Sequence, residues 1–89
     1  GDKAMHIELQ MDNMACNILK DEYPQSEKYL TSINGGEAWI LSADVFRCEA
    51  PGRFMIGLVD HVKILHGEEL KDYVEGYIKK HFKAEQVNI

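Results

Sequence analysis

The feature that most constrains this chain is a stripe of apolar side chains near its C-terminus. The members recur every three or four residues, which is the period of an α-helix. Glu68 and Glu69 precede the stripe and Lys79 and Lys80 close it, an order that suits the helix dipole. The pattern predicts an amphipathic helix that must lie on another layer of the protein. The stripe consists of Leu70, Tyr73, Val74, Tyr77, Ile78, His81 and Phe82.

The N-terminal segments supply the first part of that second layer. Met5 to Met11 alternates apolar and polar side chains, which predicts a half-buried strand. We expect Asp12 to cap a short helix that runs to about Lys20. The Tyr23-Pro24 pair ends this helix, because the residue before proline is driven from the helical region. Residues 25–28 are polar and predict a loop.

A hairpin follows in the middle of the chain. Asn34-Gly35-Gly36 predicts a tight turn between strands at 29–33 and 37–46, since asparagine and glycine tolerate the positive φ angles of such turns. In the second strand we expect two faces of different character. One face carries Trp39, Leu41, Ala43 and Val45, and the other carries Ala38, Ile40, Ser42 and Asp44.

The remaining segments predict a helix and a final strand. Pro51 suits the first turn of a helix, where its missing N–H costs nothing. Residues 61–65 alternate, so Val62 and Ile64 share one face of a strand. The expected helix has an apolar face made of Phe54, Met55, Leu58 and Val59.

The predicted order of elements is β-α-β-β-α-β-α. Two crossovers around one hairpin predict an α+β fold, a ferredoxin-like split βαβ sandwich. We expect the added C-terminal helix to lie at a sheet edge or over the second face. Residues 1–4 are interpreted as a tag scar or linker, and 5–89 as a single domain.

Composition and charge narrow the functional class. The net charge is −5 and the longest basic run is the Lys79-Lys80 pair, which argues against binding to the phosphate backbone of a nucleic acid. The chain has no long apolar run or signal-peptide pattern. Cys16 and Cys48 lack CxxC partners. We interpret them as reduced structural thiols in a cytoplasmic protein.

Polar and aromatic residues give no recognisable catalytic or metal motif. The four histidines form no HxxxH pair, so we expect no metal site, cofactor or enzymatic activity. His81 is interpreted as a packed histidine with a hydrogen bond at the edge of the helix. Tyr23, Tyr29 and Trp39 could form a stacking platform for bases, but core packing is the favoured interpretation.

Two arginines are the candidate contact residues. Arg47 and Arg53 are the only arginines in the sequence, and they flank the connector that leads into the second helix. Together they could bind an anion or a partner carboxylate in a bidentate manner. The alternative is that both are solvated surface charges.

The segment from Phe54 to Leu65, FMIGLVDHVKIL, followed by Glu68 to Lys71, resembles the C-terminal extension of WYL-domain transcriptional regulators. The likeness extends from Met5 to Phe82, with an opening strand, a helix, a Tyr-Pro loop and a hairpin. The quoted motifs are hydrophobic and structural. The family often has proline where this chain has His66-Gly67.

The resemblance implies a bacterial regulator in which this domain supports dimerisation and the response to an effector. DNA binding would belong to an N-terminal domain of the parent protein, and effector sensing to its WYL domain. The implied partners are a second copy of the chain and that WYL module. The alternative is a stand-alone ferredoxin-like module that binds small molecules.

Overall fold

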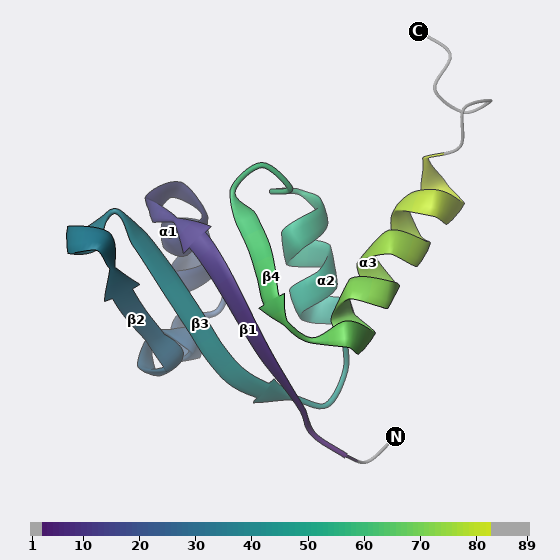
Figure 1. The fold of residues 1–89 in the computed structure, drawn as a ribbon, viewed down its shortest axis with the longest axis horizontal. Coiled ribbons are helices and arrows are strands. Elements are labelled where there is room, and N and C mark those ends of the chain that lie inside the picture. The colour runs from purple at the N-terminus through teal and green to yellow at the C-terminus, as the bar shows by residue number, and fades with distance from the viewer. Residues whose placement is uncertain (1–2, 83–89) are drawn as a thin grey trace, which may run out of the picture.

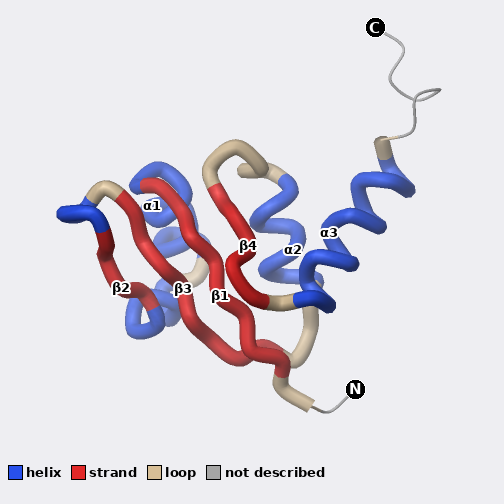
Figure 2. The backbone as a smooth tube through the Cα atoms, in the orientation of Figure 1, coloured by secondary structure: helices blue, strands red, loops and turns tan. Residues whose placement is uncertain are grey.

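The computed structural model describes residues 3–82, which form one sheet with helices on one side and a helix at its edge (Figure 1). Its layers are easily traced in the tube view (Figure 2). The elements are β1 (Met5–Asp12), α1 (Asn13–Glu22), η1 (Pro24–Tyr29), β2 (Leu30–Ile33), η2 (Asn34–Gly36), β3 (Ala38–Val45), α2 (Glu49–Ile56), β4 (Val62–His66) and α3 (Glu68–His81), η denoting a 3₁₀-helix.

The protein is an α+β fold with an open four-stranded sheet. The strand order is β2-β3-β1-β4, and each neighbouring pair is antiparallel. On the central strand, Leu9 lies opposite Leu41 of β3 and Ile64 of β4. A register shift follows, in which Glu8 pairs with His66 and Leu65 is left without a partner on β1. Leu65 is correspondingly exposed.

The first helix begins where the sequence predicts and ends at Glu22, slightly beyond the expected end near Lys20. Asp12 accepts a hydrogen bond from the backbone N–H of Ala15 at 2.9 Å, which confirms the expected cap. Tyr23 ends the helix. The prediction of a loop at 25–28 was wrong, because Pro24 opens a 3₁₀-helix whose six residues continue to Tyr29.

The hairpin is confirmed. Asn34, Gly35 and Gly36 have φ angles of 52°, 66° and 90°, the conformation that glycine and asparagine tolerate best. Both flanking strands form, and β3 is one residue shorter at each end than predicted.

The second helix is shorter than predicted. α2 ends at Ile56, and Leu58 and Val59 belong to a series of turns and not to a helical face. Backbone hydrogen bonds from Leu58 N to Met55 O and from His61 N to Leu58 O, both 2.8 Å, hold these turns. Val59 is 57% exposed. The helix stops at Gly57, because glycine has a low helix propensity.

One face of the sheet carries the core. Ile7, Leu9 and Met11 of β1 are almost completely buried, and α1 and α2 cover them (Figure 2). The expected inner face of β3 is confirmed, with Leu41 buried and Trp39 packed against the core. Tyr23 and Tyr29 are 41% and 44% exposed, so the core interpretation was wrong for both tyrosines.

The apolar stripe of α3 is only half covered. Leu70 and Val74 are buried, whereas Ile78 and Phe82 are 36% and 57% exposed. α3 packs on α2, whose eight residues span about 12 Å against about 21 Å for the fourteen of α3. The last turns of α3 therefore extend beyond the part of the helix that packs on α2 (Figure 1). The expectation that the whole stripe is packed was wrong for this reason.

Candidate functional site

The C-terminal end of α3 carries apolar side chains that the rest of the described chain leaves exposed. We call Tyr77, Ile78, His81 and Phe82 the outer stripe. The rings of Tyr77 and His81 lie 4.2 Å apart between centroids, so His81 is stacked and exposed. The expected hydrogen bond of His81 does not form within residues 3–82. In the outer stripe Ile78, His81 and Phe82 are thus exposed, and Tyr77 is half-buried.

Close packing of two helices positions this surface. Gly52 of α2 is buried next to the ring of Tyr73 of α3, and a Cβ at Gly52 would lie 2.5 Å from two ring carbons. Gly67 has a φ of 133° and turns the chain from β4 into α3. Two glycines therefore set where α3 starts and how near it approaches α2.

The two candidate arginines do not line one common site. Arg47 lies in the connector between β3 and α2, and Arg53 lies in the last turn of α2. Both are exposed, and neither forms an ion pair within residues 3–82. Arg47 lines a depression of about 560 Å³ that does not include Arg53. The structure supports two separate surface charges next to the α2–α3 pair.

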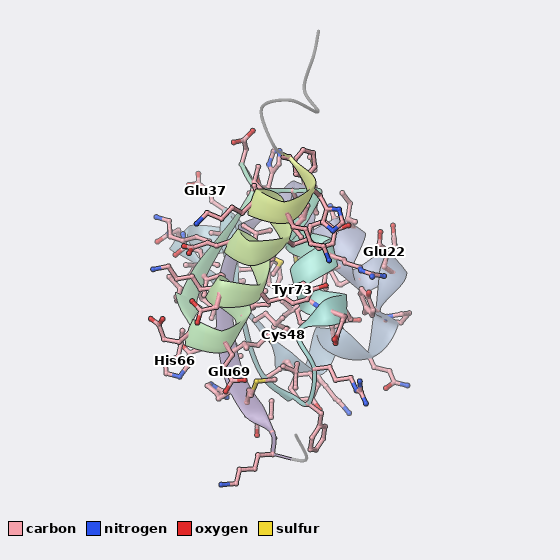
Figure 3. All side chains as sticks on the ribbon, turned by 90° about the vertical axis from the view of Figure 1, so that its right-hand side faces the viewer. Glu22, Glu37, Cys48, His66, Glu69 and Tyr73 are labelled. Atoms are coloured by element: carbon pink, nitrogen blue, oxygen red, sulfur yellow. The ribbon has the colours of Figure 1, made fainter. Side chains whose placement is uncertain are left out.

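The depression beside Arg47 contains a thiol that is not activated. Cys48 and Glu69 lie at the same end of the α2–α3 pair (Figure 3). Burial, and then the charges of Glu69 and Glu49, raise the pKa of the Cys48 thiol. A raised pKa keeps the thiol protonated, whereas a nucleophilic cysteine requires a lowered one. Cys16 is buried, and burial raises its pKa as well.

The solvent-facing side of the sheet carries a polar cluster around His6. Its Nδ1 lies 2.8 Å from Oδ1 of Asp44 and its Nε2 lies 3.1 Å from Oε2 of Glu8. The hydrogen bonds with Asp44 and Glu8 raise the pKa of His6. The stabilising contribution is therefore complete below the ordinary histidine pKa and is lost as the pH rises through the raised value. Ser42 and His66 border the cluster.

A second histidine contact ties a loop to the first helix. His61 Nδ1 lies 2.6 Å from Oδ2 of Asp12, the residue that caps α1. The bond from Ala15 N–H, and then that from His61, lowers the pKa of Asp12. The stabilisation is present above the ordinary aspartate pKa and is lost as the pH falls through the lowered value. The contact between His61 and Asp12 therefore holds the loop before β4 against the start of α1, which is a structural role.

The histidines and carboxylates do not gather into a metal centre in the described chain. Within residues 3–82, no group of three or more histidine, cysteine, aspartate and glutamate side chains is placed to hold an ion. No helix in the same range has the length and apolar character needed to cross a membrane.

No protein-family model, curated protein or solved structure matches the chain.

The sequence pointed to the whole stripe of α3 and did not distinguish its outer half. It also missed the His6 cluster, because His6, Glu8, Ser42 and Asp44 are brought together by strand register. The signal that could have found this cluster is the pairing of β1 with β3. The alternation of polar residues on both strands already places these side chains on one face.

Proposed function

We propose that this chain is a non-catalytic regulatory and assembly domain of a WYL-type transcriptional regulator, built on a ferredoxin-like fold. It would act in the cytoplasm, without a cofactor. Its partners would be a second copy of the chain and the WYL module of the parent protein. Contact with DNA would be made only by an N-terminal domain of that parent.

The ferredoxin-like assignment is supported by the order of the strands. β1 connects to β2 through α1, and β3 connects to β4 through α2, and in each case one antiparallel strand lies between the connected pair. A split βαβ sandwich requires such an intervening strand in both crossovers, so the strand order supports the proposed fold. The segment that resembles the WYL extension, Phe54 to Leu65, supplies part of α2, the turns and most of β4.

The observation that carries the functional proposal is the half-covered stripe of α3. A helix that needed only to complete this core could end after Val74, yet the apolar spacing continues to Phe82. Apolar surface that is regularly spaced, exposed and held on a rigid element is a common mark of protein contact. We therefore assign the inner half of the stripe to folding and the outer half to assembly.

A mechanical role requires no activated side chain. In residues 3–82 both thiols have raised pKa values, and the histidines are engaged with carboxylates, an aromatic ring or another histidine. An effector could act through such a domain only by favouring one of two docked arrangements. The outer stripe is the surface whose docking would differ between them.

Sequencing the DNA immediately upstream of the region that codes for this chain tests the assignment to a WYL-type regulator. A continuous reading frame with a helix-turn-helix and a WYL segment would support the regulator. A start codon directly before residue 5 would contradict it and favour the stand-alone small-molecule module.

Arg47 and Arg53 give a prediction in the full-length regulator. Both are exposed and without ion pairs in the described chain, so replacing them should leave the fold intact. If they contact the partner subunit or the WYL module, Arg53→Ala alone should blunt the effector response, and the double alanine variant should do so more strongly.

The measurement is effector-dependent operator binding by the full-length protein at fixed salt. Lys63→Ala, an exposed cation on β4 at a distance in sequence from both arginines, is the matched control. Normal effector dependence in the double variant would contradict a contact role for the arginines.

A further inference from the structure

Three side chains on the solvent-facing side of the sheet are placed as a nucleophile, a base and an orienting carboxylate. Oγ of Ser42 lies 3.1 Å from Nε2 of His6, and Nδ1 of His6 lies 2.8 Å from Oδ1 of Asp44. These are the two hydrogen bonds that define a serine–histidine–aspartate triad, which is recognised by geometry and not by position in the sequence.

Strand register holds the three groups together. His6 of β1 is paired directly with Asp44 of β3, and Ser42 precedes Asp44 by two residues, so both project from the same face of β3. β1 and β3 are the two central strands of the sheet, and α1 and α2 lie on its other side (Figure 2). All three side chains are exposed, so a reagent in solution can reach them.

Asp44 decides which nitrogen of His6 carries the proton. A carboxylate only accepts, so Nδ1–H donates to Asp44, and in the neutral imidazole Nε2 keeps its lone pair. That lone pair can accept the hydroxyl proton of Ser42. Oε2 of Glu8 lies 3.1 Å from the same Nε2 and accepts from it when the ring is protonated. Glu8 therefore competes with Ser42, and neutral His6 is the form that can act as a base.

We propose that Ser42 is a site of covalent modification by small activated esters, that is, aryl esters or thioesters. Oγ of Ser42 would form a bond with the carbonyl carbon and pass its proton to Nε2 of His6. The bond from that carbon to the leaving oxygen or sulfur would then break. The leaving atom would keep the electron pair and take the proton from His6, so the products are an acyl-serine and a free phenol or thiol.

The open setting limits how far this reaction proceeds. The three side chains lie on an exposed strand surface, so the ester must be reactive by itself. A nucleophile, a base and a carboxylate include no preorganised donor for the oxyanion, and one such donor is worth about 10²–10³ in rate. Removal of the acyl group by water needs the same stabilisation. We therefore expect one acylation at Ser42 without repeated turnover, which is compatible with a non-catalytic domain and independent of the outer stripe.

The test is incubation of the chain with p-nitrophenyl acetate, followed by the release of p-nitrophenolate and by mass spectrometry of the digested protein. We expect an acetyl group on Ser42, and far less on Ser32. Ser32 is the internal control, because it is an exposed serine on β2 whose side chain forms no hydrogen bond within residues 3–82. His6→Gln should slow acetylation of Ser42 about a hundredfold. Asp44→Asn should also slow it, because the required tautomer of His6 is lost.

The pH dependence separates a base from a histidine that only holds the strands together. The titratable groups that face His6 are Glu8 on β1, Asp44 on β3 and His66 on β4, whose ring centroid lies 5.8 Å from that of His6. The hydrogen bonds with Asp44 and then with Glu8 raise the pKa of His6, so the rate should rise with pH and level off above the raised value. Glu8→Ala removes one of these bonds and should move the rise to lower pH.

Three results would overturn the proposal. The first is equal acetylation of Ser42 and Ser32, and the second is acetylation confined to lysines. The third is a parent-like rate at Ser42 in both His6→Gln and Asp44→Asn. Circular dichroism of each variant checks that the fold is kept, which we expect because the replaced side chains are exposed.

Discussion

Val74→Asp is expected to lower the free energy of unfolding by about 4 kcal/mol, because it removes a packed side chain and buries an unpaired carboxylate. Val74 is 8% exposed and belongs to the core. A domain of this size has a total stability of about 5–13 kcal/mol, so the loss is a large fraction of the total. In domains of this length each kcal/mol lowers the melting temperature by several degrees, so we expect a fall of roughly 20 °C. Thermal melts followed by circular dichroism measure the effect.

The matched control lies one helical turn further along the same stripe. Ile78→Asp introduces the same carboxylate at a position that is 36% exposed, and it should cost about 1 kcal/mol or less. The contrast between the two variants separates the inner half of the stripe from the outer half. Equal losses would show that α3 is covered along its whole length.

The second large effect is expected at Gly52. Alanine in place of glycine inside a helix normally adds up to about 1 kcal/mol of stability. At Gly52 the new Cβ would lie 2.5 Å from the ring of Tyr73, so the two helices must separate or the ring must rotate away. We expect Gly52→Ala to lower stability by about 1–3 kcal/mol.

Gly76 is the natural control for this substitution. It lies in α3, and an added Cβ would meet nothing within 4 Å, so Gly76→Ala should raise stability by about 0.5–1 kcal/mol. A double-mutant cycle tests whether the contact with the Tyr73 ring causes the loss of stability. Gly52→Ala made in a Tyr73→Ala background should no longer lower the free energy of unfolding. A loss that persists in that background would exclude the ring contact as its source.

Local features of the sequence predicted much of the fold. The cap at Asp12, the positive-φ turn at Asn34-Gly35-Gly36 and the alternation of β1 each depend on a few neighbouring residues. Leu58 and Val59 misled the prediction because their apolar spacing continues that of α2 after Gly57 has ended it. The helix period cannot show where backbone hydrogen bonding stops.

Tertiary arrangement accounts for what the sequence could not predict about the candidate site. Periodicity identifies the apolar side of α3 but not the length of α2 that covers it. The contact of Gly52 with Tyr73 has no linear signal, because glycine in a helix reads only as a weak helix former.

Sedimentation velocity of the chain from micromolar to millimolar concentration tests the assembly role of α3 most directly. We expect a dimer that forms with rising concentration and is lost in Ile78→Asp, whose fold should remain intact. Lys80→Asp places the same carboxylate on the exposed polar side of α3 and should still associate. A parent chain that stays monomeric throughout, or an Ile78→Asp variant that associates equally well, would contradict the proposed role of the outer stripe.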